Sequence, residues 1–196
     1  VNNTFNGVKI DNENRLHRIV SLKTQNPKLK MLLSIGGWGS GRFSEMAADS
    51  KLRKAFAEDC KRVVNDFNLD GIDIDWEYPT QSSANISSSP EDIQNFTFLM
   101  RDLRQVLGKK KLLTCATAAN GTYYDFPNSL KYMDFVNVMA YDMANPPKHH
   151  SALYKSPISG WNTSDGAVKA HLKLGVPASK LVMGVPFYGR GKEHDY

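Results

Sequence analysis

The segment that decides the fold reads Asp70-Gly71-Ile72-Asp73-Ile74-Asp75-Trp76-Glu77-Tyr78-Pro79. Acidic and apolar residues alternate along it. Because successive side chains of a β-strand point to opposite faces, the alternation predicts a strand with Ile72, Ile74 and Trp76 on one face and the acids on the other. The outer face of a β/α barrel packs against helices and requires apolar side chains, so the acids are predicted to point into the barrel.

The acidic face of this strand carries Asp73, Asp75 and Glu77 at alternate positions. Alternate residues of a strand lie ~6.5–7 Å apart, so the three carboxyl groups can converge to hydrogen-bonding distance. Like charges held together in a barrel interior oppose one another's ionisation. The pattern therefore predicts proton sharing, with at least one pKa well above the ordinary ~4 of a carboxylic acid, as a general acid working near neutral pH requires.

The acidic segment has two other interpretations. An exposed edge strand with a solvated acidic face would accommodate the acids, but it leaves the apolar opposite face and the terminal Trp-Glu-Tyr-Pro run unexplained. Three acids could also bind magnesium or calcium, since both cations prefer oxygen ligands. The sequence has no second cluster of ligands, so a metal site is the weaker hypothesis.

Short apolar runs alternate with helix-like segments along the chain, which is typical of a parallel sheet in an α/β protein. The predicted strands are 30–35, 71–75, 111–116, 134–139 and 180–185, and the predicted helices are about 12–23, 50–67, 90–107 and 164–174. Long polar segments, 80–89 and 143–162, follow two of the strands. Loops after the strands build the active sites of β/α folds, so these loops indicate a substrate cleft.

Capping signals set the predicted helix boundaries. Asp49 or Ser50 can cap the second helix, and Ser89 is predicted to cap the third, with Pro90 at its first position and Gly108 after its end. The second helix also has an apolar face at three-to-four spacing, formed by Leu52, Phe56, Cys60, Val63 and Val64. No low-complexity linker interrupts the chain, so one domain is expected.

The composition is that of a globular protein and disfavours several other classes. The 196 residues are 41% hydrophobic, and the formal net charge is +5. Basic residues are scattered and usually adjoin acids, so nucleic-acid binding is not expected. Cys60 and Cys115 have apolar neighbours and are expected to be buried free thiols. No stretch of the sequence reaches the ~20 apolar residues of a membrane span.

The acidic segment resembles the signature D-x-x-D-x-D-x-E of glycoside hydrolase family 18, and its form D-G-I-D-I-D-W-E-Y-P looks like that of the family's chitinases. Three further family motifs occur in order: Ser34-Ile35-Gly36-Gly37-Trp38 (S-x-G-G), Met139-Ala140-Tyr141-Asp142 (M-x-Y-D) and Gly184-Val185-Pro186-Phe187-Tyr188-Gly189-Arg190 (G-x-P-x-Y-G-R). The resemblance covers almost the whole chain. It implies an α/β fold of the TIM (β/α)8 barrel type and the hydrolysis of chitin.

The resemblance also implies a mechanism in which no enzyme carboxylate attacks the sugar. Family members cleave β-1,4-linked N-acetylglucosamine polymers with retention, and the acetamido oxygen of the substrate itself forms an oxazolinium intermediate. By similarity, Glu77 protonates the leaving oxygen and then activates water. Asp75 would orient the acetamide and stabilise the intermediate, Asp73 would share a proton with Asp75, and Tyr141 would donate to the acetamide oxygen.

Other matched positions are expected to bind or support the substrate. Met139 would form an apolar wall, and Asp142 would accept from sugar hydroxyls or from Glu77. The other substrate-binding candidates are Trp38, Tyr78, Tyr188 and Arg190, and the supporting candidates are Ser34, Gly36, Gly37 and Asp70. Trp38 and Tyr78 would stack on sugar faces. Ser34 would hydrogen-bond within the carboxylate cluster, the two glycines would allow close backbone approach beneath the sugar, and Arg190 would reach a sugar oxygen or a buried acid near Asp142.

The resemblance implies no cofactor and no metal, because the nucleophile comes with the substrate. The expected partner is chitin or a chito-oligosaccharide, with no nucleic acid and no membrane insertion. The full-length protein is expected to be a monomer that is secreted, periplasmic or on the cell surface. His149 and His150, in the loop after the M-x-Y-D motif, are expected to be surface residues.

Two functions from other classes stay open. A chitinase-like lectin would keep the cleft, but such proteins usually lose the acid at the position of Glu77, which is present here. An endo-β-N-acetylglucosaminidase acting on N-glycans shares D-x-x-D-x-D-x-E but usually lacks the Trp-Glu-Tyr-Pro context and the G-x-P-x-Y-G-R strand.

The chain is expected to be a single catalytic domain, residues 1–196, that is an incomplete barrel truncated at both ends. A complete barrel usually takes about 250 residues and eight strands. Only five strands are predicted, and they match the family's third to seventh. The first two strands are expected before Val1, with residues 1–10 resembling the turn after the second, and the eighth is expected after Tyr196. Expressed alone, the segment is expected to be inactive on chitin oligomers.

Overall fold

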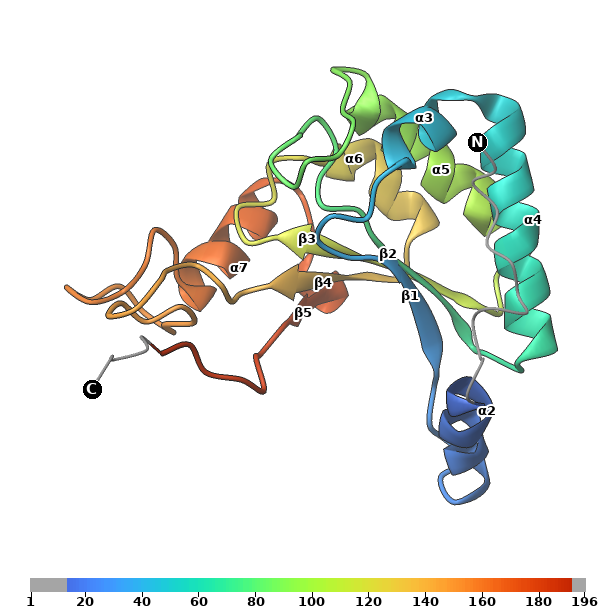
Figure 1. Cartoon of the computed structure of the whole chain (residues 1–196), viewed down its shortest axis with the longest axis horizontal. Helices are drawn as coiled ribbons and strands as arrows, with labels where there is room; N and C mark the ends of the chain where they lie inside the picture. The colour runs from blue at the N-terminus through green and yellow to red at the C-terminus, as the bar shows by residue number, and fades with distance from the viewer. Residues whose placement is uncertain (1–13, 192–196) are drawn as a thin grey trace.

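The computed structural model describes residues 14–191, whose centre is a parallel sheet with the strand order β1-β2-β3-β4-β5 (Figure 1). The strands are β1 (Leu32–Gly36), β2 (Gly71–Asp75), β3 (Leu112–Ala118), β4 (Phe135–Met139) and β5 (Leu181–Met183). The five predicted strands are thus confirmed to within two residues at each end. Because neighbouring strands are parallel and consecutive, all their carboxyl ends meet at one edge of the sheet.

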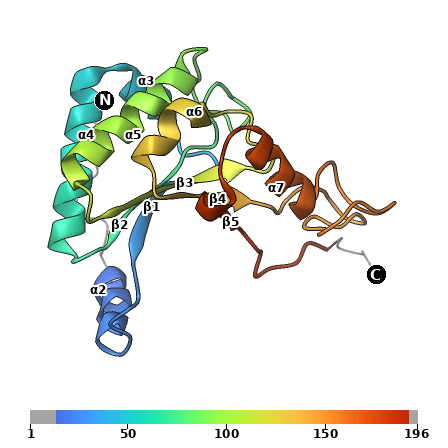
Figure 2. The same cartoon turned by 180° about the vertical axis from the view of Figure 1, so that it is seen from behind.

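Helices precede and connect the strands, and the two longest cover the apolar face of the sheet. They are α2 (Arg15–Val20), α3 (Phe43–Ala48), α4 (Ser50–Asp66), α5 (Asp92–Leu107), α6 (Phe126–Ser129) and α7 (Ser164–Lys173), with 3-10 turns η1 (Ser21–Thr24), η2 (Leu130–Tyr132) and η3 (Ala178–Lys180). Both views show α4 and α5 side by side against the sheet (Figures 1 and 2). The part of the first predicted helix before residue 14, and residues 1–10, lie outside the described residues.

The apolar side of β2 forms the middle of the core, as the alternation predicted. Ile72 and Ile74 are completely buried, and Trp76 is 1% exposed. The Trp76 ring stacks on Phe43 of α3 with 5.5 Å between ring centroids. The two cysteines of the core, in α4 and β3, are buried and free, as predicted. Burial of these large apolar side chains fixes which face of β2 the acids must occupy.

Aspartates lie at the starts of the two longest helices, but only the one before α4 caps its helix. Asp49 accepts from two backbone N–H groups of the first turn of α4, as predicted. The prediction that Ser89 caps α5 is wrong, because α5 begins at Asp92 and the Ser89 side chain does not cap it. Instead the buried Asp92 carboxylate accepts from the backbone N–H of Ser89 at 2.8 Å and of Thr80 at 3.1 Å. Asp92 therefore anchors both ends of the loop that follows the acidic strand.

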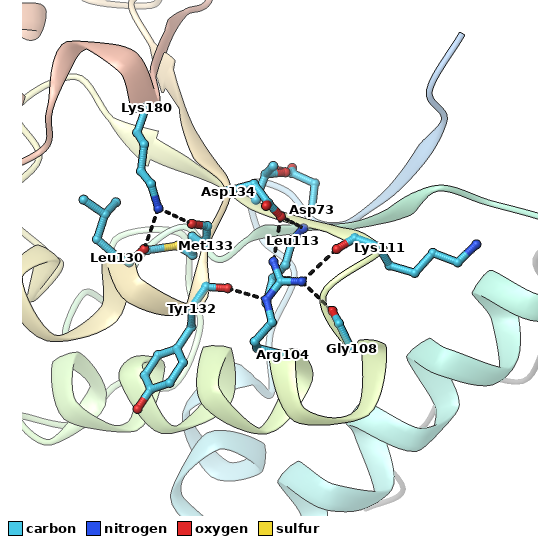
Figure 3. A network of polar contacts seen from close by, with 11 residues as sticks. Asp73, Arg104, Gly108, Lys111, Leu113, Leu130, Tyr132, Met133, Asp134 and Lys180 are labelled. Carbon is cyan, nitrogen blue, oxygen red and sulfur yellow. Dashed lines mark hydrogen bonds and ion pairs between the residues drawn. The ribbon is translucent and has the colours of Figure 1, made fainter. Parts of the chain in front are cut away.

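A polar network fixes the amino-terminal ends of β3 and β4 (Figure 3). Arg104, in the last turn of α5, pairs with Asp134 at 2.6 Å between Nη2 and Oδ2. It also donates to the backbone carbonyls of Gly108, Lys111 and Tyr132. Lys180 donates to the carbonyls of Leu130 and Met133. These charged donors satisfy carbonyl groups of the connecting loops at this end of the sheet.

The same end of the sheet holds Asp70, the first acid of the motif. Its carboxylate accepts from Lys23 Nζ at 2.9 Å, from Lys30 Nζ at 3.4 Å and from the backbone N–H of Met31 at 2.8 Å. Asp70 thereby ties the segment before β1 to the start of β2. Within residues 14–191, no helix is both long enough and apolar enough to cross a membrane.

Candidate active site

Asp73 lies on the inner face of β2 and accepts hydrogen bonds from three other strands. Ser34 Oγ of β1 donates at 2.7 Å, Thr114 Oγ1 of β3 at 2.6 Å and Asn137 Nδ2 of β4 at 3.0 Å. The hydrogen bond predicted for Ser34 is therefore confirmed, whereas the other two donors were not predicted. In the described part of the chain no hydrogen bond joins Asp73 to Asp75, so proton sharing between them stays a prediction.

A cavity of about 770 Å³ opens at the carboxyl ends of the strands. Eight of the candidate residues line it: Trp38, Asp75, Glu77, Tyr78, Met139, Tyr141, Asp142 and Arg190. Five residues that the sequence did not single out line it too: Ala118, Ala119, Asn120, Tyr123 and Trp161. The lining residues lie at the carboxyl ends of the strands or in the segments that follow them, which is the edge where β/α folds build their active sites.

Two of the three acids that line the cavity, Asp75 and Glu77, hold their protons more tightly than free carboxylic acids. Burial, followed by the charges of Glu77 and Asp73, raises the pKa of Asp75 to about 7. One Asp75 oxygen, Oδ1, is buried without a hydrogen-bond partner. Burial also raises the pKa of Glu77, a hydrogen bond from Tyr78 partly opposes this, and the charge of Asp142 adds to it. The predicted carboxyl group with a pKa well above 4 is thus confirmed for Asp75.

The paired glycines at the end of β1 lie against the acidic strand. Gly36 has φ 128°, and a Cβ there would lie 1.9 Å from the backbone oxygen of Asp75. The N–H of Gly37 donates to the same oxygen at 2.8 Å. Gly36 therefore permits a close approach between two strands, whereas the expected approach of the glycine backbone to a sugar stays a prediction.

Aromatic side chains form one wall of the cavity. Trp38 is 62% exposed and meets Tyr78 edge to face, with ring centroids 6.4 Å apart. Tyr78 stacks on Tyr123 with a centroid distance of 5.1 Å. The three rings give the wall an extended apolar surface with hydroxyl and indole N–H groups at its edge, which suits the mixed polar and apolar surface of a sugar.

Asp142, after β4, pairs with Arg190 and lies beside the ring of His150. Its φ is 55°, and its Oδ1 lies 2.6 Å from Arg190 Nε and 3.4 Å from His150 Nδ1. The hydrogen bond from Arg190 is the main reason that the pKa of Asp142 is lowered. Arg190 was expected to reach an acid near Asp142, and it pairs with Asp142 itself. An ionised Asp142 can accept hydrogen bonds at the rim of the cavity.

His150 is a component of the site that the sequence interpretation missed. It was expected on the surface, but its side chain is 15% exposed, and its ring stacks on Tyr188 at a centroid distance of 5.4 Å. The loop folds back because the N–H of Met143 donates to the His150 carbonyl at 2.9 Å. The Asp142 N–H also donates to His150 Nδ1 at 3.2 Å. His149 is exposed, as expected.

Comparison with known proteins connects this cavity to one family. The model for "Glycosyl hydrolases family 18" matches residues 2–195. The chain belongs to this family. The parallel sheet with helices on its outer face is accordingly part of the TIM barrel of family 18.

Relatives with names and structures point the same way. The chain is 38% identical over 201 residues to Chitinase A1 of Niallia circulans, covering 90% of the chain and 29% of the relative. The chitinase domain of the spore coat protein CotE from Clostridium difficile is 36% identical with a TM-score of 0.84, over 89% of the chain and 54% of that domain. A family 18 N-acetylglucosaminidase from Paenibacillus barengoltzii is 38% identical with a TM-score of 0.81, over 88% and 56%.

The remaining candidates of the family 18 motifs lie beside or away from the cavity. Those that do not line it are Asp73, Ser34, Gly36, Gly37, Tyr188 and Asp70. The first five touch lining residues or one another. Asp70, predicted as a supporting residue, lies outside the cavity at the opposite end of β2, five positions and ~17 Å before Asp75. The signature D-x-x-D-x-D-x-E therefore contains Asp70, which binds the segment before β1, as well as Asp75 and Glu77, which face the cavity.

Proposed function

We propose that the protein containing this chain hydrolyses β-1,4-linked N-acetylglucosamine polymers with retention, and that Glu77 is its general acid and base. The observation that carries the proposal is the pair Asp75 and Glu77, two acids with raised pKa in one cavity wall. The proposal is also supported by the match to the family 18 model over residues 2–195 and by relatives that are named as chitinases. The chain spans 29–45% of the first three curated relatives, so the activity is proposed for the longer protein.

The proposed first step breaks the glycosidic bond with help from the substrate. The acetamido oxygen forms a bond to the anomeric carbon as the bond to the leaving oxygen breaks, and Glu77 transfers its proton to that leaving oxygen. In the second step water attacks the anomeric carbon, the ring of the oxazolinium ion opens, and Glu77 takes the proton from water. Two displacements at one carbon leave its configuration unchanged.

Other residues have positioning roles in this proposal. Asp75, with a pKa of about 7, can hold a proton for the acetamide or balance the positive intermediate. Asp73 would share that proton. Tyr141 would donate to the acetamide oxygen, and Met139 would contact the sugar through its apolar side chain.

The decisive experiment compares Glu77→Gln with Glu58→Gln in the full-length protein. Glu58 lies exposed on α4, outside the cavity, so its variant controls for the loss of a carboxylate. We expect Glu77→Gln to cut cleavage of a chitin hexamer by about 10²–10⁴-fold while the hexamer still binds. Near-normal turnover of Glu77→Gln would refute the acid role.

The same assay separates the other functional classes. A lectin would bind the hexamer without cleaving it in the wild-type protein. An endo-acting enzyme on N-glycans would release oligosaccharide from a glycoprotein and leave the hexamer intact. We further propose that residues 1–196 belong to a single catalytic domain, with a chito-oligosaccharide as its partner and a location outside the cytoplasm.

A further inference from the structure

Trp161 lies in the segment between β4 and α7 and lines the cavity with 63% of its surface exposed. No motif of the sequence includes it. Tryptophan has the largest apolar surface of any side chain, and leaving such a ring in water forgoes the stabilisation that burial would give. The indole lies at the wall of a cavity that is also lined by Asp75, Glu77 and Asp142, where it can contact a ligand bound in the cavity.

The backbone that carries Trp161 is fixed at three points. Its N–H donates to the carbonyl of Met143 at 3.1 Å. The preceding Gly160 packs on the same carbonyl, where a Cβ would come within 1.9 Å. The following Asn162 donates its side-chain amide to the carbonyl of Ala119 at 3.1 Å. The indole is thus presented from a braced segment, and a ligand that stacks on it does not have to order the backbone first.

Trp161 and Trp38 face the cavity from different parts of the sheet. Trp38 follows β1 and is 62% exposed, and Trp161 belongs to the segment after β4. Between β1 and β4 lie β2, which carries the acids, and β3. Three strand spacings correspond to ~14 Å at the sheet, and Figure 1 shows the orange segment after β4 well apart from the blue loop after β1. Two rings so placed cannot contact the same sugar face.

We propose that Trp161 is a second sugar platform, which stacks on the apolar face of a pyranose ring remote from the bond that is cleaved. The inference rests on the proposed function and extends it, because it gives the cavity a binding position for a further sugar of the chain. Stacking on the CH-rich face of a sugar would cover the exposed indole and explain why a rigid segment presents it.

Tyr154 provides the matched control. It lies in the same loop, is 66% exposed and does not line the cavity. If exposed aromatic residues of this loop served instead to dock another protein surface, loss of Tyr154 and loss of Trp161 would have similar small effects on sugar binding. If Trp161 is a sugar platform, only its own loss matters.

The test uses the full-length protein with Glu77→Gln, so that binding is measured without turnover, and titrates chito-oligosaccharides by calorimetry. Adding Trp161→Ala should weaken binding of the hexamer about tenfold, Trp161→Phe should recover most of the affinity, and Tyr154→Ala should change nothing. In the active protein, Trp161→Ala should raise KM for the hexamer with kcat kept.

Unchanged hexamer affinity in Trp161→Ala would overturn the inference, as would a fall in kcat with KM unchanged. If the Glu77→Gln protein with Trp161 intact binds no oligomer, the proposed function itself is overturned and the platform with it. Near-UV circular dichroism of each variant shows whether the fold is kept, and Trp161→Phe keeps the test decisive where Trp161→Ala does not fold.

Discussion

The two ends of β2 hold acids in opposite electrical surroundings. At the amino end, Asp70 is bound by two lysines and a backbone N–H. At the carboxyl end, Asp75 and Glu77 face a cavity, and in the described part of the chain neither forms an ion pair with Lys or Arg. Burial acts on both ends, but only the amino end has cations to compensate for it.

The pKa values follow this difference. Burial raises the pKa of Asp70, yet the hydrogen bond and charge of Lys23 and the N–H of Met31 more than offset it, so the pKa is lowered. For Asp75, burial and the neighbouring charges of Glu77 and Asp73 act in the same direction, and the pKa rises to about 7. Ionised Asp70 therefore stabilises the folded protein, whereas ionisation of Asp75 at the other end of the same strand destabilises it.

Among substitutions of the two aspartates Asp70 and Asp75, the largest effect should come from removing the charge of Asp75 in the active protein. We expect Asp75→Asn to lower kcat on a chitin hexamer by about 10²–10³-fold, because the positive intermediate loses its partner. Steady-state kinetics of the full-length variant measure this. The matched change Asp70→Asn should leave kcat within about twofold, since Asp70 lies outside the cavity. An equal loss in both variants would contradict the division of β2 into two functional ends.

A smaller effect of the same substitution should appear in stability. The pKa of Asp75 is higher in the folded state than in the unfolded chain, so ionisation opposes folding and stability falls as pH rises from about 4 to about 7. Asp75→Asn should therefore raise the free energy of unfolding by about 2 kcal/mol above pH 7, a value reduced for the partial exposure of the group, and by nothing below about pH 4. Urea unfolding at pH 4 and pH 8 tests it; a loss of stability at pH 8 would contradict it.

The smallest effect, of opposite sign, should come from Asp70→Asn. The folded-state pKa of Asp70 is lowered, so its contribution is complete above about pH 4 and is lost as pH falls through the folded value. We expect Asp70→Asn to lower the free energy of unfolding by about 1 kcal/mol at pH 7 and to change it little near pH 2. The effect is small because the two lysines are partly exposed to solvent. The same unfolding experiment measures it, and a stabilising Asp70→Asn at pH 7 would be the wrong sign.

The elements of the fold could be predicted because their causes are local. The alternation around Asp73 fixed the orientation of β2, and Asp49 caps α4 through its own first turn. The start of α5 was predicted two residues too early. Asp92, at its first position, accepts from the Ser44 hydroxyl and from the N–H groups of Thr80 and Ser89, and contacts with other parts of the chain are not visible in the local sequence.

The parts of the site that were missed depend on contacts between distant segments. His150 meets Asp142 only because their loop folds back, and Trp161 reaches the cavity only because its backbone is bound to the carbonyl of Met143. Asn137 bonds Asp73 across 64 positions of sequence. Asp70 was grouped with the site for the converse reason: a motif is contiguous in sequence, but a strand separates its two ends in space.

The hydrogen bonds at Asp73 have a bearing on protein engineering. Its carboxylate gathers side chains from β1, β3 and β4, so a graft of the ten-residue acidic segment onto another scaffold would bring the acid without the groups that orient it. A graft that keeps the surroundings of Asp73 must therefore include four strands in their native register. Ser34 and Thr114 reach Asp73 because they are paired directly beside it in the sheet. A mutant library that randomises Thr114 or Asn137 would remove hydrogen bonds to the Asp73 carboxylate, although every residue of the acidic segment stays unchanged.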